Sequence, residues 1–443
     1  MQQLKYYIRT WGCQMNEHDS ERYSGMFKQM GHIEVKKLKD ADIVLFNTCC
    51  VRETAERKVL GNIGRLKNFR KQKPDLKIII AGCMMQQPHV IDKIKKDLSF
   101  VNLIVGTYNI HRFPLLFEKV LEKKNSKGPL VEVWDKPKTI VEGIPSIRKY
   151  KFKASVNIMY GCNNFCSYCI VPYTRGRERS RGKEAIIDEI SSLVKDGVLE
   201  VTLLGQNVNS YGRDLYSDYD FSDLISDVDK IDGIRRIRFM TSHPKDATEK
   251  LIATIKASQN ICENFHLPVQ SGSNSILNKM NRHYTREQYL GFVKKLYEGI
   301  PEITLSTDII IGFPEETESD FEDTLSLAKE VYFDSAYIFL YSKRSGTKAA
   351  ESSHQISEKV KHERFDRALL EMNSIAYEKN LKIVGSTEKV LVDGLSDKYP
   401  GNVYGRTRGN KIMTFKGDSS LIGTIVLVRI LEAKRATLIG ELC

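Results

Sequence analysis

The chain has 443 residues, of which 41% are hydrophobic and 28% are charged. These fractions match ordinary globular proteins and exclude a disordered chain, a collagen and a chain-long coiled coil. Lysines and arginines number 68 against 56 aspartates and glutamates, and the resulting net charge of +12 favours a polyanionic partner such as a nucleic acid.

No segment predicts export or membrane insertion. Residues 1–9 carry Lys5 and Arg9 and lack the apolar centre of a secretory signal. The longest uncharged stretch, residues 154–174, contains three asparagines and three cysteines, which excludes a membrane span. We therefore expect a cytoplasmic protein with no membrane partner. In a reducing cytosol its nine cysteines are expected to be metal ligands or catalytic thiols rather than disulfides.

The first segment, residues 1–122, alternates short apolar runs with amphipathic helical patterns and predicts a Rossmann-like parallel α/β domain. Three strands are predicted, at residues 4–8, 43–46 and 76–81. A cysteine follows each strand closely: Cys13, Cys49 and Cys83. Because parallel strands end at one common edge of a sheet, these cysteines are expected to converge there. The alternative is that they are ordinary core cysteines. Cys50, beside Cys49, is expected to point elsewhere.

Glycines and prolines among charged residues predict a linker or strap without regular structure at residues 123–147. A longer series of alternating strands and helices follows over residues 148–380. Six strands are predicted, at residues 154–159, 200–204, 234–240, 264–267, 304–311 and 335–341. Six units are too few for a full eight-stranded barrel, so we expect an open, partial (β/α)6 barrel of the TIM type. The catalytic and binding residues of this barrel are expected at the carboxyl ends of its strands.

The last segment, residues 381–443, has a different pattern of closely spaced short strands separated by glycines. Five strands are predicted, at residues 388–392, 403–408, 411–415, 424–430 and 436–440. A β-barrel of this size is typical of small nucleic-acid-binding domains of the OB-like kind. The ten basic and six acidic residues of the segment agree with that use.

A Cys-x3-Cys-x2-Cys motif follows the first strand of the open barrel, at Cys162, Cys166 and Cys169. Three thiolates in so short a loop can bind three irons of a four-iron cluster, since iron prefers sulfur ligands. The fourth iron then stays open to the amino and carboxylate groups of a cofactor. The alternative is a zinc site whose fourth ligand lies elsewhere, at Cys262 or at a histidine.

The cysteine loop, with Tyr168 before its last cysteine, resembles the radical S-adenosylmethionine superfamily. The strings Gly161 to Gly176 and Leu204 to Gly212 are similar to those of the methylthiotransferases that modify tRNA, and most similar to the branch that acts on N6-isopentenyladenosine. Further strings match the same family, at residues 10–16, 47–49, 82–84, 267–273 and 311–314. The carboxy-terminal barrel resembles the TRAM domain of that family.

The resemblance implies two 4Fe-4S clusters and S-adenosylmethionine as cofactors. A cluster on Cys162, Cys166 and Cys169 would cleave S-adenosylmethionine reductively to a 5'-deoxyadenosyl radical. An auxiliary cluster on Cys13, Cys49 and Cys83 would be methylated on a sulfur by another S-adenosylmethionine. The product would carry a methylthio group at C2 of N6-isopentenyladenosine at tRNA position 37. Cys50 stands where the family more often has serine, and its thiol could compete as a ligand.

Other residues are expected to contact the cofactor or the RNA. The cofactor candidates are Tyr168 in the cysteine loop and four residues at strand ends, with structural capping as the alternative: Gln206, Asn207, Ser242 and Gln270. Nine lysines and arginines accompany one acid between residues 148 and 183, which predicts phosphate contacts or else a solvated surface loop. The RNA candidates are Arg175, Arg177, Arg406 and Arg408. A base in the single-stranded anticodon loop can be splayed into a pocket at modest cost.

The implied reaction also needs an electron donor and a source of sulfur or cluster repair, and nothing demands more than a monomer. Two alternatives remain at this stage. The same chemistry could act on threonylcarbamoyladenosine in tRNA or on an aspartate of a ribosomal protein. A non-catalytic RNA-binding protein with structural zinc belongs to a different class.

Overall fold

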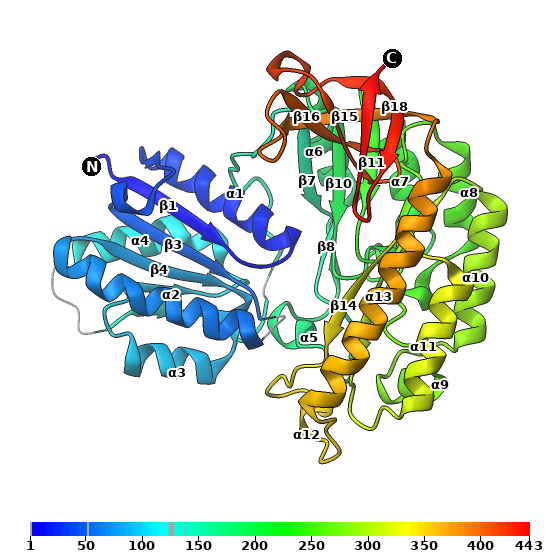
Figure 1. The fold of residues 1–443 in the computed structure, drawn as a ribbon. Helices are drawn as coiled ribbons and strands as arrows, with labels where there is room; N and C mark the ends of the chain where they lie inside the picture. Colours follow the sequence, from blue (N-terminus) through cyan, green and yellow to red (C-terminus); the bar gives the residue numbers. More distant parts are fainter. Residues whose placement is uncertain (1, 51–52, 124–127, 138) are drawn as a thin grey trace.

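Three β-structures follow one another along the chain in the computed structural model, which describes residues 2–50, 53–123, 128–137 and 139–443. They are a six-stranded sheet, a pair of three-stranded sheets and a closed five-stranded barrel (Figure 1). A small two-stranded sheet of β8 (Met159–Tyr160) and β9 (Arg179–Ser180) accompanies the pair. The predicted α/β fold class, with a parallel sheet, an open barrel and a small β-barrel, is confirmed. Within the described ranges no helix is both long and apolar enough to cross a membrane.

The amino-terminal sheet has the strand order β2-β1-β3-β4-β5-β6, and all of its pairs are parallel. Its strands are β1 (Lys5–Thr10), β2 (Ile33–Glu34), β3 (Ile43–Thr48), β4 (Lys77–Gly82), β5 (Leu103–Val105) and β6 (Leu130–Glu132). Its helices are α1 (Gln14–Gln29), α2 (Glu53–Gln72), α3 (Pro88–Asp97) and α4 (Phe113–Glu122). The register of β1, β3 and β4 brings their carboxyl ends level, because Thr10 pairs with Asn47 and Thr48 pairs with Gly82.

Alternate residues of β3 pack on opposite faces of this sheet, as the two-residue period of a strand requires. Val44 and Phe46 belong to a core shared with α2 and α3. Ile43 and Leu45 belong to a second core, shared with α1 and α4. Helices therefore cover both faces, which explains why every residue of β3 is buried.

The segment predicted as an irregular linker contains β6, which the sequence prediction missed. The strand pairs in parallel with β5 at the edge of the sheet. A strand at the edge of a sheet pairs with one neighbour only. Three residues between glycine- and proline-rich stretches are therefore enough to form β6. The segment then runs along α1, where the amide of Ile147 donates to the carbonyl of Glu21 at 2.9 Å. A Cβ added to Gly25 of α1 would lie 2.3 Å from the carbonyl oxygen of Pro145, so the contact is close.

The central part is an open barrel of six parallel strands in chain order. Its strands are β7 (Lys153–Asn157), β10 (Glu200–Leu204), β11 (Arg236–Phe239), β12 (Asn264–His266), β13 (Thr304–Ile311) and β14 (Ser335–Leu340). They form two sheets, and a parallel bridge between Ile237 and Ile261 joins them. All six strands predicted for this part are present.

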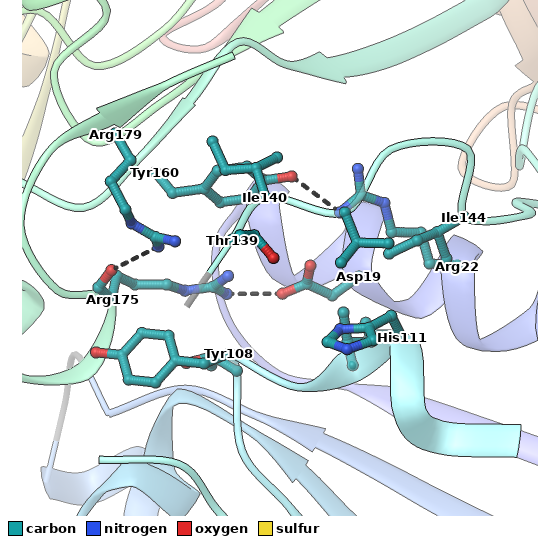
Figure 2. A pocket seen from close by; sticks show the side chains of 13 residues that line it. Asp19, Arg22, Tyr108, His111, Thr139, Ile140, Ile144, Tyr160, Arg175 and Arg179 are labelled. Carbon is teal, nitrogen blue, oxygen red and sulfur yellow. Dashed lines mark hydrogen bonds and ion pairs between the residues drawn. The ribbon is translucent and has the colours of Figure 1, made fainter. Parts of the chain in front are cut away.

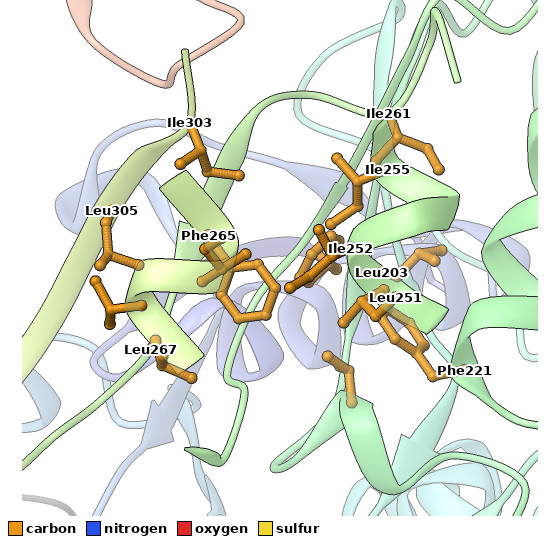
Figure 3. Packing of buried hydrophobic residues seen from close by; sticks show 14 of the residues in the cluster. Leu203, Phe221, Leu251, Ile252, Ile255, Ile261, Phe265, Leu267, Ile303 and Leu305 are labelled. Atoms are coloured by element: carbon orange, nitrogen blue, oxygen red, sulfur yellow. The ribbon is translucent and has the colours of Figure 1, made fainter. Parts of the chain in front are cut away.

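Helices cover the outside of the open barrel and bury its apolar residues. The long helices are α6 (Lys183–Lys195), α7 (Phe221–Asp229), α8 (Glu249–Ala257), α10 (Arg286–Gly299), α11 (Glu318–Val331) and α13 (Glu358–Lys382). Figure 3 shows Phe265 of β12 pointing toward Ile252 of α8, with Leu305 of β13 on its other side. The hydrophobic core of the open barrel is therefore formed by side chains of both its strands and its helices.

The carboxy-terminal barrel is closed in the order β15-β16-β17-β19-β18. Its strands are β15 (Thr387–Leu395), β16 (Asn402–Thr407), β17 (Ile412–Lys416), β18 (Ile425–Ala433) and β19 (Thr437–Leu442). Two buried arginines of β11 attach it to the open barrel: Arg236 donates to the carbonyls of Lys389 and Arg406, and Arg238 to those of Thr407 and Arg408. The small barrel is thus attached near the amino ends of the open-barrel strands.

Glu200, the first residue of β10, balances these buried arginines. Its carboxylate accepts a hydrogen bond of 3.0 Å from Nε of Arg238, and the ammonium of Lys153 lies at 3.3 Å. Burial alone would raise the pKa of Glu200, but the charges of Arg238, Lys153 and Arg236 lower it to about 2. The carboxylate therefore stays ionised at neutral pH and counters the arginine charge inside the interface.

Replacing Arg238 by methionine should destabilise the chain, because Glu200 loses its nearest partner and two backbone carbonyls of the interface lose their donor. A broken buried ion pair costs about 3–5 kcal/mol. Urea unfolding followed by circular dichroism measures the loss. The control is Arg429→Met, since Arg429 is exposed on β18 and surface changes cost less than about 0.5 kcal/mol. Equal losses for the two variants would contradict this account of the interface.

Candidate functional site

The three cysteines of the open barrel lie in a loop that its own backbone and its neighbours hold firmly. The loop follows β8 (Met159–Tyr160) and ends at the short helix α5 (Val171–Thr174). The amide of Ser167 donates to the carbonyl of Met280 at 3.0 Å, and Asn281 donates to two further loop carbonyls. Gly161 is required at the entry, because its φ is +78° and a Cβ there would lie 2.0 Å from the carbonyl oxygen of Arg177.

The sulfur atoms of this loop lie in a buried, partly cationic environment. Cys162 and Cys166 are each 9% exposed. Arg282, which is buried, donates from Nη1 to the sulfur of Cys166 at 3.3 Å and from Nη2 to the carbonyl of Pro268 at 2.8 Å. Burial raises the pKa of Cys162 and of Cys169 to about 12. Metal binding at these thiols must therefore release their protons.

The amino-terminal cysteines lie at the carboxyl ends of three adjacent strands. Cys13 precedes α1, Cys49 follows β3, and Cys83 begins a short 3-10 turn after β4. The loops pack tightly, because a Cβ added to Gly12 would lie 2.8 Å from the Cβ of Cys49. The structure thus brings these three loops together at one edge of the sheet, where the strand pattern predicts them.

Two buried asparagines tie the amino-terminal loops together, and the sequence prediction missed both. Asn16 donates to Oδ1 of Asn47 at 3.2 Å and to the carbonyl of Thr48 at 3.3 Å. Asn47 donates to the carbonyl of Asn16 at 2.7 Å. Asn16 also accepts from the thiol of Cys13 at 3.4 Å. Their place in the same short strings as the cysteines was the available signal.

The prediction that Cys50 points away from the other cysteines is wrong. Cys50 is buried against Cys83, and its thiol lies 3.8 Å from Oγ1 of Thr174, to which it donates. A hydrogen bond from Cys50, helped by the nearby charge of Arg175, lowers the pKa of Cys83. The reason is that the chain leaves the sheet at this point, so the alternation of side chains along a strand no longer applies. Cys50 is therefore part of the amino-terminal site.

Arg175, predicted as a phosphate contact, lies inside the protein. It is 5% exposed, and its Nε donates to the sulfur of Cys83 at 3.1 Å. Its Nη2 donates to Oδ2 of Asp19 at 2.7 Å. The sequence prediction could not foresee this, because both partners are more than 90 residues away in the chain. Arg175 belongs to the amino-terminal cysteine site and not to the outer surface.

The other predicted RNA contacts differ in their surroundings. Arg177 is exposed and lies over the ring of Phe165, at 4.2 Å from the ring centre. Arg406 is partly exposed and donates to Asn410. Arg408 is held by both carboxylate oxygens of Glu263 and by two backbone carbonyls. We therefore assign Arg408 to the interface between the barrels, which corrects its prediction as a phosphate contact.

The predicted cofactor contacts lie beside the cysteine loop at the carboxyl ends of the strands. Gln206 accepts from the amide of Gly161 and contacts the sulfur of Met15. Asn207 donates to Asp246 at 2.7 Å. Gln270 has a φ of +70°, and its backbone amide donates to the carbonyl of Asp308. The hydroxyl of Tyr168 accepts from Arg282 at 3.5 Å.

Several buried polar atoms at these strand ends lack a hydrogen-bond partner among the residues that the structure describes. They are Oδ1 of Asn207, both amide atoms of Asn209, Oγ of Ser242 and Nε2 of His243. Burial, together with the charge of Arg282, keeps the pKa of His243 far below its usual value, so this ring is neutral. Buried polar groups are normally satisfied, and a set of unsatisfied ones beside a cysteine loop indicates a site for a polar ligand. The other ring nitrogen of His243, Nδ1, accepts from the backbone amide of Lys245 at the start of a short 3-10 turn.

Each of the two cysteine sites contains three predicted cluster ligands. In the part of the chain that the structure describes, no three His, Cys, Asp or Glu side chains are arranged to hold one metal ion. In a four-iron cluster each cysteine binds a different iron. Cys262, the alternative fourth zinc ligand, is buried near Arg238 and Glu200, at the opposite end of the strands from the cysteine loop.

A cavity lies beside the amino-terminal cysteine site, between α1, the segment around residues 139–144 and the loop after β8 (Figure 2). Its lining combines arginines and ring residues with aliphatic residues of the strap, Ile140, Val141 and Ile144. The labelled polar and aromatic residues are Asp19, Arg22, Tyr108, His111, Thr139, Tyr160, Arg175 and Arg179. Two of the arginines are hydrogen-bonded within this lining, Arg175 to Asp19 and Arg22 to Tyr160.

The chain is similar to known proteins over its whole length. Three family models match it: Uncharacterized protein family UPF0004 over residues 5–106, the Radical SAM superfamily over 156–328 and the TRAM domain over 382–443. It is 55% identical to the tRNA-2-methylthio-N(6)-dimethylallyladenosine synthase of Alkaliphilus oremlandii, with 99% of this chain and 92% of that protein covered. It is 52% identical to the protein of the same name from Clostridium botulinum strain Loch Maree, with 99% and 96% covered.

A solved structure shares the fold. The radical S-adenosylmethionine methyltransferase TsrM of Kitasatospora setae matches with a TM-score of 0.58 at 14% identity, over 79% of this chain and 77% of that chain.

Replacing Gly12 by alanine should disturb the amino-terminal cysteine loops. The added Cβ would lie 2.5 Å from Oδ1 of Asn16, in a conformation with φ of +146°. Overpacking costs about 1–3 kcal/mol. The matched control is Gly31→Ala, where φ is also positive but nothing lies within 4 Å of the added atom. The free energy of unfolding of the metal-free chain should fall more for Gly12→Ala; equal losses would show that the loops are not tightly packed.

Proposed function

The chain belongs to the family of tRNA-2-methylthio-N(6)-dimethylallyladenosine synthases, and from this premise we propose how its two cysteine sites divide the work. It is a tRNA methylthiotransferase that converts N6-isopentenyladenosine at position 37 to the 2-methylthio derivative. One observation supports the proposal that the two cysteine sites act together. Arg175, six residues after Cys169 of the barrel loop, donates to the sulfur of Cys83 in the amino-terminal loops. Two cysteine sites joined by so short a connection can serve one substrate carbon.

The chain takes two 4Fe-4S clusters and S-adenosylmethionine. Cys162, Cys166 and Cys169 would hold the cluster of the open barrel, and Cys13, Cys49 and Cys83 would hold the auxiliary cluster. The two sets of cysteines fit such clusters. Each set supplies three thiols, and close packing and hydrogen bonds hold the loops that carry them. When bound, these groups supply the radical chemistry that the unactivated C2–H bond of adenine requires, together with the sulfur.

Residues of the open barrel would bind and orient S-adenosylmethionine. The unpartnered atoms of Asn207, Asn209 and Ser242 offer hydrogen bonds to its polar groups. Arg282 holds Cys166 and the hydroxyl of Tyr168 in place through hydrogen bonds. Because these groups are buried, a bound cofactor would react away from bulk water, where electrostatic contacts are stronger.

The tRNA would approach the junction of the two cysteine sites. The exposed guanidinium of Arg177, stacked on Phe165, lies beside the cysteine loop and suits a phosphate or a splayed base. The cavity of Figure 2 adjoins the same junction. Arg406 in the small barrel provides a second, more distant contact.

The remaining partners follow from the chemistry. Reductive cleavage of a sulfonium needs an electron donor, and each product carries away one sulfur, so a sulfur or cluster-repair source must replace it. We place the enzyme in the cytoplasm as a monomer. Its working units would be residues 1–122 with the auxiliary cluster, the strap 123–147, the radical core 148–380 and the RNA-binding barrel 381–443.

Replacing Cys13 by alanine should separate the two activities. The reconstituted enzyme is incubated anaerobically with a reductant, S-adenosylmethionine and tRNA that carries N6-isopentenyladenosine, and nucleosides are analysed by mass spectrometry. The wild-type chain should form the methylthio product. The variant should still cleave S-adenosylmethionine reductively, because the barrel loop is unchanged, but should form less than about one hundredth of the product.

Two controls complete this experiment. Cys443→Ala changes an exposed terminal thiol and should leave both reactions unchanged. Unmodified tRNA should give no methylthio product. Product formation by Cys13→Ala at the wild-type rate would refute the auxiliary role of this cysteine, and product on threonylcarbamoyladenosine instead would refute the substrate.

A further inference from the structure

A buried ion pair lies within the amino-terminal cysteine site. Its members are Asp19, 6% exposed, and Arg175, 5% exposed, with 2.7 Å between Oδ2 and Nη2. The same guanidinium uses Nε to donate to the sulfur of Cys83 at 3.1 Å. Figure 2 shows the two side chains meeting at the wall of the cavity. One arginine thus contacts an acid and a cysteine of the site at once.

The two charges come from different parts of the chain. Asp19 lies on α1, six residues after Cys13, so the helix that begins at a cysteine carries the acid. Arg175 directly follows the last residue of α5, and its backbone amide donates to the carbonyl of Val171 at 2.8 Å. The carbonyl of the preceding Thr174 accepts from Oγ1 of Thr107 at 2.8 Å, which anchors α5 to the amino-terminal part. The open barrel therefore supplies a charge to a cysteine site whose thiols come from the amino-terminal part.

The chemistry of a cluster held by thiolates makes such charges important. A four-iron cluster with charge 2+ and three thiolates carries a net charge of −1, and reduction by one electron makes it −2. In a buried site of low dielectric a neighbouring cation favours the more negative state, and a neighbouring anion opposes it. Hydrogen bonds to the sulfur atoms act in the same direction as the cation.

We propose that Arg175 and Asp19 set the reduction potential of the auxiliary cluster, Arg175 raising it and Asp19 lowering it. The inference rests on the proposed function, since it takes the auxiliary cluster as given. Arg175 acts on the cluster through Cys83 and is a positioning residue in this sense. Because the arginine comes from the open barrel, this potential depends on the docking of the two parts of the chain.

A purely structural role predicts something different. If the pair only joined the two parts of the chain, loss of either member would loosen the same contact, and both variants would change in the same way. Charge control predicts opposite changes, because Arg175→Gln leaves the acid alone beside the cluster, whereas Asp19→Asn leaves the cation. Asparagine keeps the shape of aspartate and can still accept from Arg175.

The test measures the midpoint potential of the auxiliary cluster by electron paramagnetic resonance during a redox titration. The full chain carries Cys162→Ala, Cys166→Ala and Cys169→Ala, so that the auxiliary cluster alone contributes. Arg175→Gln should lower the potential and Asp19→Asn should raise it. Each shift should equal at least a tenfold change in the ratio of reduced to oxidised cluster, about 59 mV for one electron.

The matched control is Arg22→Gln. Arg22 lies on α1 and lines the same cavity, but its guanidinium donates to the hydroxyl of Tyr160 at 3.0 Å rather than to a cysteine. The midpoint potential of Arg22→Gln should shift by less than the amount that corresponds to a threefold change in the ratio of reduced to oxidised cluster. A shift for Arg22→Gln as large as that for Arg175→Gln would overturn the assignment to the pair.

Shifts of the same sign in both variants, or no shift in either, would overturn the inference. If Arg175→Gln binds no iron, two other variants provide the test. Asp19→Asn must raise the midpoint potential, and Arg175→Lys, which keeps the positive charge, must bind iron. Failure of either result would overturn the inference. A parent chain that binds no iron at Cys13, Cys49 and Cys83 would overturn the proposed function itself, and the inference with it.

Discussion

Five residues of chain separate Cys169, the last cysteine of the barrel loop, from Arg175, whose guanidinium donates to the sulfur of Cys83. The helix α5 fills this interval and is anchored to the amino-terminal part through Thr107. The distance between the two cysteine sites is therefore limited by one short, hydrogen-bonded stretch of backbone. A reaction in which two cofactor sites act on one carbon depends on such a limit, because a misplacement of about 1 Å can cost a hundredfold in rate.

The two ends of the open barrel have separate tasks. At the carboxyl ends of the strands lie the cysteine loop and the unpartnered polar atoms of Asn207 and Ser242. Near the amino ends, Arg236 and Arg238 donate to backbone carbonyls of the small barrel. The small barrel can thus bind RNA without obstructing the catalytic end. This agrees with the general placement of chemistry at the carboxyl ends of parallel strands.

Much of this architecture could be predicted from the sequence. The strand and helix periods predict the order of the three β-structures, and the strand ends place Cys13, Cys49 and Cys83 on one edge. The surroundings of Cys50, Arg175 and Arg408 could not be predicted, because their partners are distant in the sequence and are brought close by packing between parts of the chain. Charge in a sequence suggests contact with phosphate, but a charge can equally be buried against a thiol or a carboxylate. A strand of three residues such as β6 gives too short a pattern to stand out from a linker.

The most direct test of the account is the iron content of the anaerobically reconstituted chain. Two separate cysteine sites predict about eight irons and about eight sulfides per chain. A chain with Cys162, Cys166 and Cys169 replaced by alanine should retain about four irons, and so should a chain with Cys13, Cys49 and Cys83 replaced. Zinc in place of iron, or an iron content that one set of replacements leaves unchanged, would contradict the account.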